Sequence, residues 1–121
     1  MPSPGAWLTA FLLTFLVEAP IVVALTRDSE VGVARRVALV FFAQLVTHPL
    51  VWFVFPYIVG LRSGTATLLS EIWAWLAEAV FYALVLRGVT FTRALAVSAI
   101  ANGASVLVGV AMTHWERGVG G

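Results

Sequence analysis

The chain has 121 residues, of which 61% are hydrophobic and only 11% are charged, and its mean hydropathy is +1.00. A soluble domain typically has about 45–50% apolar and about 25% charged residues, so this composition excludes a soluble globular protein and indicates a single integral membrane domain over residues 1–121, with the lipid bilayer as its partner. A net charge of +1 excludes the basic surface that nucleic acid binding requires, and the absence of cysteine excludes disulfides and thiolate metal sites.

Four segments are long and apolar enough to be transmembrane helices, since a bilayer core of about 30 Å requires about 20 mainly apolar residues per helix. In chain order they are Ala6–Leu25, Val37–Val59, Thr67–Leu86 and Ala94–Thr113. The connections between them are short and polar, which makes neighbouring helices antiparallel and packs them as a bundle. We therefore predict an all-α fold: a polytopic membrane protein that forms a four-transmembrane-helix bundle.

All seven basic residues are arginine, and their distribution predicts the orientation of the bundle. The first and third connections hold five of them: Arg27, Arg35, Arg36, Arg87 and Arg93. Because arginine accumulates in cytoplasmic loops, we expect both connections in the cytoplasm and both termini outside it, where Trp7 and Trp115 fit an interfacial aromatic belt. The lysine-free composition, rich in arginine, alanine and leucine, is typical of a high-GC bacterial genome and predicts the bacterial inner membrane.

The two halves of the chain carry matching polar residues. Glu18 aligns with Glu78 at an offset of 60 residues, and Gln44 aligns with Asn102 at an offset of 58. Matches between rare polar residues arise by chance less readily than matches between leucines or alanines. The pattern favours two tandem helical hairpins related by a pseudo-two-fold axis along the membrane normal, with a binding site near the midplane where they meet. Chance similarity is the alternative.

Polar side chains cluster at one depth of the predicted bundle. Counted from the arginines at about 1.5 Å of rise per residue, five residues share a slab near the bilayer centre: Glu18, Gln44, His48, Glu78 and Asn102. Glu71 lies nearer the outer face, and helical spacing places it on the same face as Glu78 and Tyr82. A charged side chain at the bilayer centre costs about 2.5–3.5 kcal/mol on insertion scales and by default marks a functional site. These seven residues are therefore the candidate ligand- or proton-binding residues.

The leading prediction is an intramembrane site that binds or conducts a proton, a metal cation or a small amphipathic substrate. Glu18, His48 and Glu78 offer two carboxylates and one imidazole, a ligand set that suits a divalent metal cofactor such as zinc. Chains of Glu and His side chains are also typical of proton relays. Aromatic residues at helical spacing, among them Trp52 and Trp75, would line a pocket for an amphipathic substrate.

The alternative is a non-catalytic accessory or assembly subunit of a larger membrane complex. In that case the polar residues hydrogen-bond across helices and leave no cavity. The small and polar residues between Ser98 and Gly109 suit a close helix contact, either within the chain or in a homodimer. No nucleophile–base pair is visible, so catalytic residues and enzyme activity are left open. His48 is the one residue of the central slab without a polar match, since Val106 stands at the aligned position.

Overall fold

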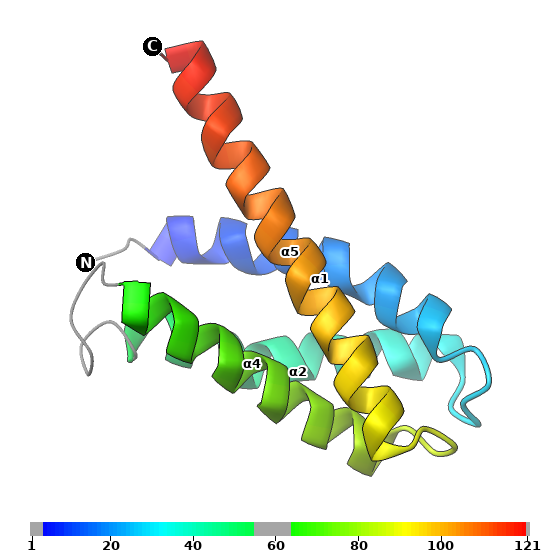
Figure 1. Ribbon diagram of the computed structural model, residues 1–121. Coiled ribbons are helices and arrows are strands. Elements are labelled where there is room, and N and C mark those ends of the chain that lie inside the picture. Colours follow the sequence, from blue (N-terminus) through cyan, green and yellow to red (C-terminus); the bar gives the residue numbers. More distant parts are fainter. Residues whose placement is uncertain (1–3, 55–63, 121) are drawn as a thin grey trace.

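The structure is a computed structural model that describes residues 4–54 and 64–120; residues 1–3, 55–63 and 121 lie outside that description, as do the side chains of Trp52, Ala66, Thr67, Thr113, Glu116, Arg117 and Val119. The described residues form four α-helices: α1 (Pro4–Leu25), α2 (Val33–Phe53), α4 (Gly64–Val85) and α5 (Phe91–Gly120). Their arrangement is shown in Figure 1. The predicted all-helical fold is confirmed.

Three of these helices are long and apolar enough to cross a membrane, over Pro4–Leu25, Leu68–Val85 and Phe91–Met112. The 22 residues of α1 extend about 33 Å, which matches a hydrocarbon core of about 30 Å. Helix α2 is not among the three: Trp52 interrupts its described apolar stretch, and the part before Trp52 includes Arg35 and Arg36. Residues 55–59 of the second predicted span lie outside the described residues. The chain is therefore membrane-like and helical, and its fourth span stays a prediction.

The helices extend beyond the predicted spans at their polar ends. Helix α2 begins at Val33 rather than Val37, and α5 runs from Phe91 to Gly120 rather than from Ala94 to Thr113. Hydropathy marks the part of a helix that suits hydrocarbon, whereas backbone hydrogen bonding continues through arginines, which are good helix formers. With 30 residues, α5 is about 45 Å long and exceeds the thickness of the hydrocarbon core.

Each helix packs against two others. Helix α1 contacts α2 and α5, and α4 contacts the same two helices, so that α1 and α4 are diagonal in the described bundle, as are α2 and α5. The core consists of small and aliphatic residues with one tyrosine, and it includes Val22, Val40, Ala43, Tyr82, Leu86, Val97 and Ala101. These residues lie in the halves of the helices nearest the two short connections, so that end of the bundle is closely packed. The contacts do not test the tandem repeat, which stays a prediction.

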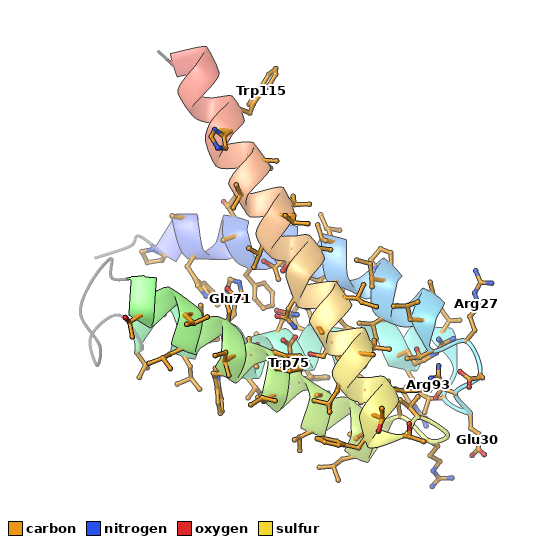
Figure 2. All side chains as sticks on the ribbon, viewed as in Figure 1. Arg27, Glu30, Glu71, Trp75, Arg93 and Trp115 are labelled. Atoms are coloured by element: carbon orange, nitrogen blue, oxygen red, sulfur yellow. The ribbon has the colours of Figure 1, made fainter. Side chains whose placement is uncertain are left out.

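Helix α5 crosses the other three at an angle, and its C-terminal half points away from them (Figure 1). Its apolar side chains are correspondingly exposed there, with Leu107 and Trp115 each 71% exposed. Trp115 stands near the far end of this half (Figure 2). The bundle is thus closed at the end with the connections and more open at the other.

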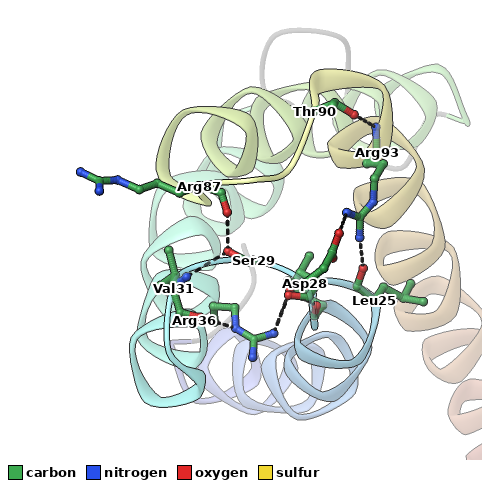
Figure 3. Close-up of polar contacts among 10 residues, drawn as sticks. Leu25, Asp28, Ser29, Val31, Arg36, Arg87, Thr90 and Arg93 are labelled. Atoms are coloured by element: carbon green, nitrogen blue, oxygen red, sulfur yellow. Dashed lines mark hydrogen bonds and ion pairs between the residues drawn. The ribbon is translucent and has the colours of Figure 1, made fainter.

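The two short connections lie side by side and are joined by hydrogen bonds. The Ser29 hydroxyl donates to the Arg87 carbonyl oxygen at 2.8 Å, and the Glu30 amide donates to the same oxygen at 3.1 Å. Arg93, near the second of these connections, forms an ion pair with Asp28 in the first (Figure 3). The five arginines of the two connections therefore gather at one end of the bundle, as the sequence predicts, and the side of the membrane on which they lie stays a prediction.

Arg36 caps the C-terminal end of α1, a role that the sequence does not predict. Its side chain is only 5% exposed, and Nη1 donates to the carbonyl oxygens of Val23 at 2.7 Å and Thr26 at 2.9 Å. Nε donates to the Val31 carbonyl oxygen at 2.9 Å (Figure 3). The last carbonyls of a helix lack intrahelical partners and carry partial negative charge, so a buried guanidinium satisfies both needs.

Candidate intramembrane binding site

A cavity of about 160 Å³ lies between the four helices, next to the closely packed core. Five of the seven predicted site residues line it: Glu18, Gln44, His48, Glu71 and Asn102. Threonine and serine hydroxyls from α1, α2 and α5 complete its polar wall, at Thr14, Thr47 and Ser105. Four of the five residues predicted to share one depth, Glu18, Gln44, His48 and Asn102, therefore line the same cavity.

Glu78 is buried beside this cavity and is held by two amides. It is 1% exposed, and its Oε1 accepts a hydrogen bond from Gln44 Nε2 at 2.8 Å. Its Oε2 accepts one from Asn102 Nδ2 at 3.0 Å. Glu78 on α4 thus links α2 to α5, and each of its carboxylate oxygens has a partner within the protein.

Glu18 is buried to the same extent, but neither of its carboxylate oxygens has a hydrogen-bond partner among the described residues. The side chains of Gln44, Ser105 and Glu78 lie close to it. Gln44 Nε2 donates to Glu78, and the Ser105 hydroxyl donates to the Asn102 carbonyl oxygen at 2.9 Å. A buried polar group without a partner costs about 1–3 kcal/mol, and more when it is charged. Glu18 is therefore a strong acceptor that faces the cavity without a donor.

His48 lies against aromatic rings of α1. Its ring centroid is 5.7 Å from that of Phe11, in an edge-on arrangement, and 6.4 Å from that of Trp7. The side chain is 9% exposed and forms part of the cavity wall. Trp7, which the sequence predicts only as an interfacial anchor, thus also packs against the candidate site. No sequence signal indicated this contact, because it depends on how α1 and α2 are rotated toward each other.

Glu71 and Tyr82 stand at the two margins of the site. Glu71 is half-buried and lines the cavity at the end away from the arginines. Tyr82 is 1% exposed and belongs to the packed core, where its hydroxyl has no hydrogen-bond partner among the described residues. Tyr82 does not line the cavity. The shared helical face predicted for these residues therefore extends from the cavity into the core.

A second, larger hollow opens beside the cavity, between α4 and α5. This groove of about 520 Å³ is almost entirely apolar and is lined by Trp75, Ala99, Gly103 and Leu107, together with three residues that also line the cavity: Glu71, Asn102 and Val106. Glu71 and Trp75 are labelled on α4 in Figure 2. The sequence does not predict this groove, because it results from the angle at which α5 leaves α4.

Two hydrogen bonds hold α4 and α5 together at the base of the groove. Trp75 Nε1 donates to the Leu95 carbonyl oxygen at 2.8 Å, and the Ser98 hydroxyl donates to the Trp75 carbonyl oxygen at 2.9 Å. These bonds hold α4 and α5 together near the connection between them. The groove begins beyond these bonds, farther from that connection.

The predicted metal site has no geometric counterpart in the residues that the structure covers. Within 4–54 and 64–120, no group of three or more His, Asp or Glu side chains that could hold a metal ion is found. Glu78, one of the three proposed ligands, has its oxygens bonded to Gln44 and Asn102. Metal binding by Glu18, His48 and Glu78 stays a prediction.

Comparison of the chain with protein-family models, curated proteins and solved structures found no match.

Proposed function

We propose that this protein binds a small hydrogen-bond-donating or cationic group of a membrane ligand in the central cavity, with Glu18 as the acceptor. The observation that carries the proposal is a carboxylate that is 1% exposed, lines a cavity of about 160 Å³ and has no donor among the described residues. A ligand N–H or O–H group would supply the missing hydrogen bond, and charge-assisted bonds of this kind are roughly twice as strong as neutral ones.

The chemistry of the cavity wall supports a donor group rather than an anion. Its polar residues are carboxylates, amides, hydroxyls and one imidazole, and no arginine among the described residues lines it. Glu18 and Glu71 reach it from two different helices. In a medium of low dielectric, two carboxylates that line the same small cavity favour the binding of a positive charge between them.

The packed core supports binding rather than conduction through the bundle. Toward the connections the cavity meets buried side chains that include Val22, Val40 and Leu86, each at most 2% exposed. A proton relay requires a chain of polar groups or water through this region, and these three side chains are apolar. Of the functions predicted from the sequence, binding of a small substrate therefore has the best geometric support.

The proposal is tested by introducing one cysteine into this cysteine-free chain. Ser105→Cys lines the cavity, whereas Ser98→Cys, on the same helix, is fully buried between α4 and α5. With the protein in lipid nanodiscs, we expect a small aminoethyl methanethiosulfonate reagent to modify Ser105→Cys and to leave Ser98→Cys unmodified, as read by mass spectrometry. Failure to modify Ser105→Cys would show that no small polar molecule reaches the cavity and would overturn the proposal.

A second candidate is the accessory or assembly subunit, which the C-terminal half of α5 favours. Leu107, Val110 and Trp115 are exposed on a helix that has left the bundle, a surface that another membrane protein or a second copy could cover. In native membranes, a maleimide–benzophenone reagent attached to Leu107→Cys should then, on illumination, crosslink the chain to one partner of defined mass. The wild type without cysteine is the control, and a lack of any such product speaks against this candidate.

A further inference from the structure

We infer that the ligand is an amphipathic amine with a single hydrocarbon chain, which enters the cavity sideways from the lipid through the groove between α4 and α5. This inference rests on the proposed function, because it names the ligand class of the same site. It adds a route of entry and a binding surface for the apolar part of the ligand.

The cavity and the groove are adjacent and share part of their walls. Glu71, Asn102 and Val106 line both spaces, so a molecule seated in one touches the wall of the other. The cavity is small and polar, at about 160 Å³, and the groove is larger and apolar, at about 520 Å³. Such a pair of spaces suits a compact polar head attached to a longer apolar tail.

Charge complementarity selects a cationic head. Glu18 offers two unbonded oxygens inside the cavity, and Glu71 stands where the cavity meets the groove. Within the part of the chain that the structure describes, no arginine lines either space. Moving an ammonium group out of water is costly, and the cost is offset only where it meets a carboxylate with good geometry. A ligand with an anionic head would instead face carboxylates without a counter-charge.

The α5 residues that form the groove are small, which keeps the route open. Ala99 and Gly103 face the groove, and a Cβ atom added at Gly103 would meet no heavy atom within 4 Å. The bonds of Trp75 to Leu95 and Ser98 close the base of the groove. A tail entering from the lipid would therefore lie along α5 above Trp75, with its head directed past Glu71 toward Glu18.

The test measures protection of Ser105→Cys from the aminoethyl reagent in nanodiscs by three probes: dodecylamine, methylamine and dodecanoate. Each CH₂ transferred from water is worth about 0.8 kcal/mol, so a bound tail should make dodecylamine protect at concentrations at least about tenfold lower than methylamine. Dodecanoate, with a chain of the same length and an anionic head, should not protect. Labelling of Gly32→Cys, in the exposed first connection, corrects for changes in membrane surface charge.

Two glycines of α5 provide matched variants. Gly103→Leu fills the groove, whereas Gly109→Leu lies outside it, and neither position has a heavy atom within 4 Å of an added Cβ. Relative to each variant's own labelling rate without amine, we expect Gly103→Leu to weaken protection by dodecylamine about tenfold and Gly109→Leu to behave like the parent. Equal protection by methylamine and dodecylamine, protection by dodecanoate, or no effect of Gly103→Leu would each overturn the inference while leaving the proposed function intact. If the reagent never reaches Ser105→Cys, both fail.

Discussion

Glu18 and Glu78 occupy aligned positions in the two halves of the chain, yet their surroundings differ. Both carboxylates are 1% exposed, but the amides of Gln44 and Asn102 donate to Glu78, and Glu18 receives neither. Glu78 thereby links two helices, whereas Glu18 has no hydrogen-bond donor among the described residues. Depth counting predicts that both lie at one level, but it cannot predict which acid the amides face, because that depends on the rotation of each helix.

This difference predicts opposite effects of one substitution at the two positions. Glu78→Met leaves the buried Gln44 amide without its acceptor and removes one acceptor of the half-buried Asn102 amide, which should lower the free energy of unfolding by about 1–3 kcal/mol. Glu18→Met strands no donor and should change stability by no more than about 0.5 kcal/mol in the destabilising direction. Thermal or denaturant unfolding of both variants in the same detergent checks this. Equal losses would show that Glu18 has a structural partner after all.

At the scale of the helices, charged residues stabilise helix ends in a way that a hydropathy profile does not reveal. Arg35 and Arg36 are adjacent and look equivalent in the sequence, but Arg35 is exposed and Arg36 is buried on the last carbonyls of α1. The spacing that places Arg36 there depends on the turn between α1 and α2, which sequence periodicity does not describe. The sequence predicts the spans well and their capping poorly for this reason.

The two arginines provide a matched pair. Arg36→Ala removes hydrogen bonds from a charged donor to the Val23, Thr26 and Val31 carbonyls and should cost about 1.5–3 kcal/mol. Arg35→Ala should change stability by about 0.5 kcal/mol or less, as is usual for an exposed residue. The readout is the unfolding midpoint in detergent at neutral pH. A loss at position 35 as large as at position 36 would contradict the capping role.

The ion pair between the two connections has a predictable pH dependence. The hydrogen bond from Arg93 holds the pKa of Asp28 below its usual value of 3.8. A lowered pKa in the folded state means that the contact contributes stability above pH 3.8 and that this contribution is lost as the pH falls through the lower, folded-state pKa. Because Asp28 is fully exposed, the contribution is small and screened by salt.

Asp28→Asn should therefore unfold at a slightly lower temperature than the wild type at pH 7 in low salt. The difference should diminish as the pH falls through the folded-state pKa of Asp28, because the wild-type carboxyl then becomes neutral as well. It should also disappear in concentrated salt at neutral pH. A difference between the two proteins that persists at low pH would mean that Asp28 acts through something other than its charge.

For the molecule as a whole, the sequence establishes the helical, membrane-like class and the shared depth of the polar residues. It does not establish the cavity, the groove or the open end of the bundle. These depend on the angle of α5, which is set by small residues and by two hydrogen bonds of Trp75 and Ser98 rather than by any periodic pattern. The orientation in the membrane stays a prediction, since the helix contacts are the same for either orientation. The tandem repeat stays a prediction as well.

The central claim is that Glu18 attracts a positively charged group into the cavity, and one labelling ratio tests it most directly. The rate at which an aminoethyl methanethiosulfonate modifies Ser105→Cys is divided by the rate for a sulfonatoethyl reagent of similar size, with Glu18 and with Glu18→Gln. We expect the cationic reagent to be preferred at least about tenfold, a difference of about 1.4 kcal/mol, and the preference to fall sharply in Glu18→Gln. A ratio that is the same with and without the Glu18 carboxylate would contradict the account.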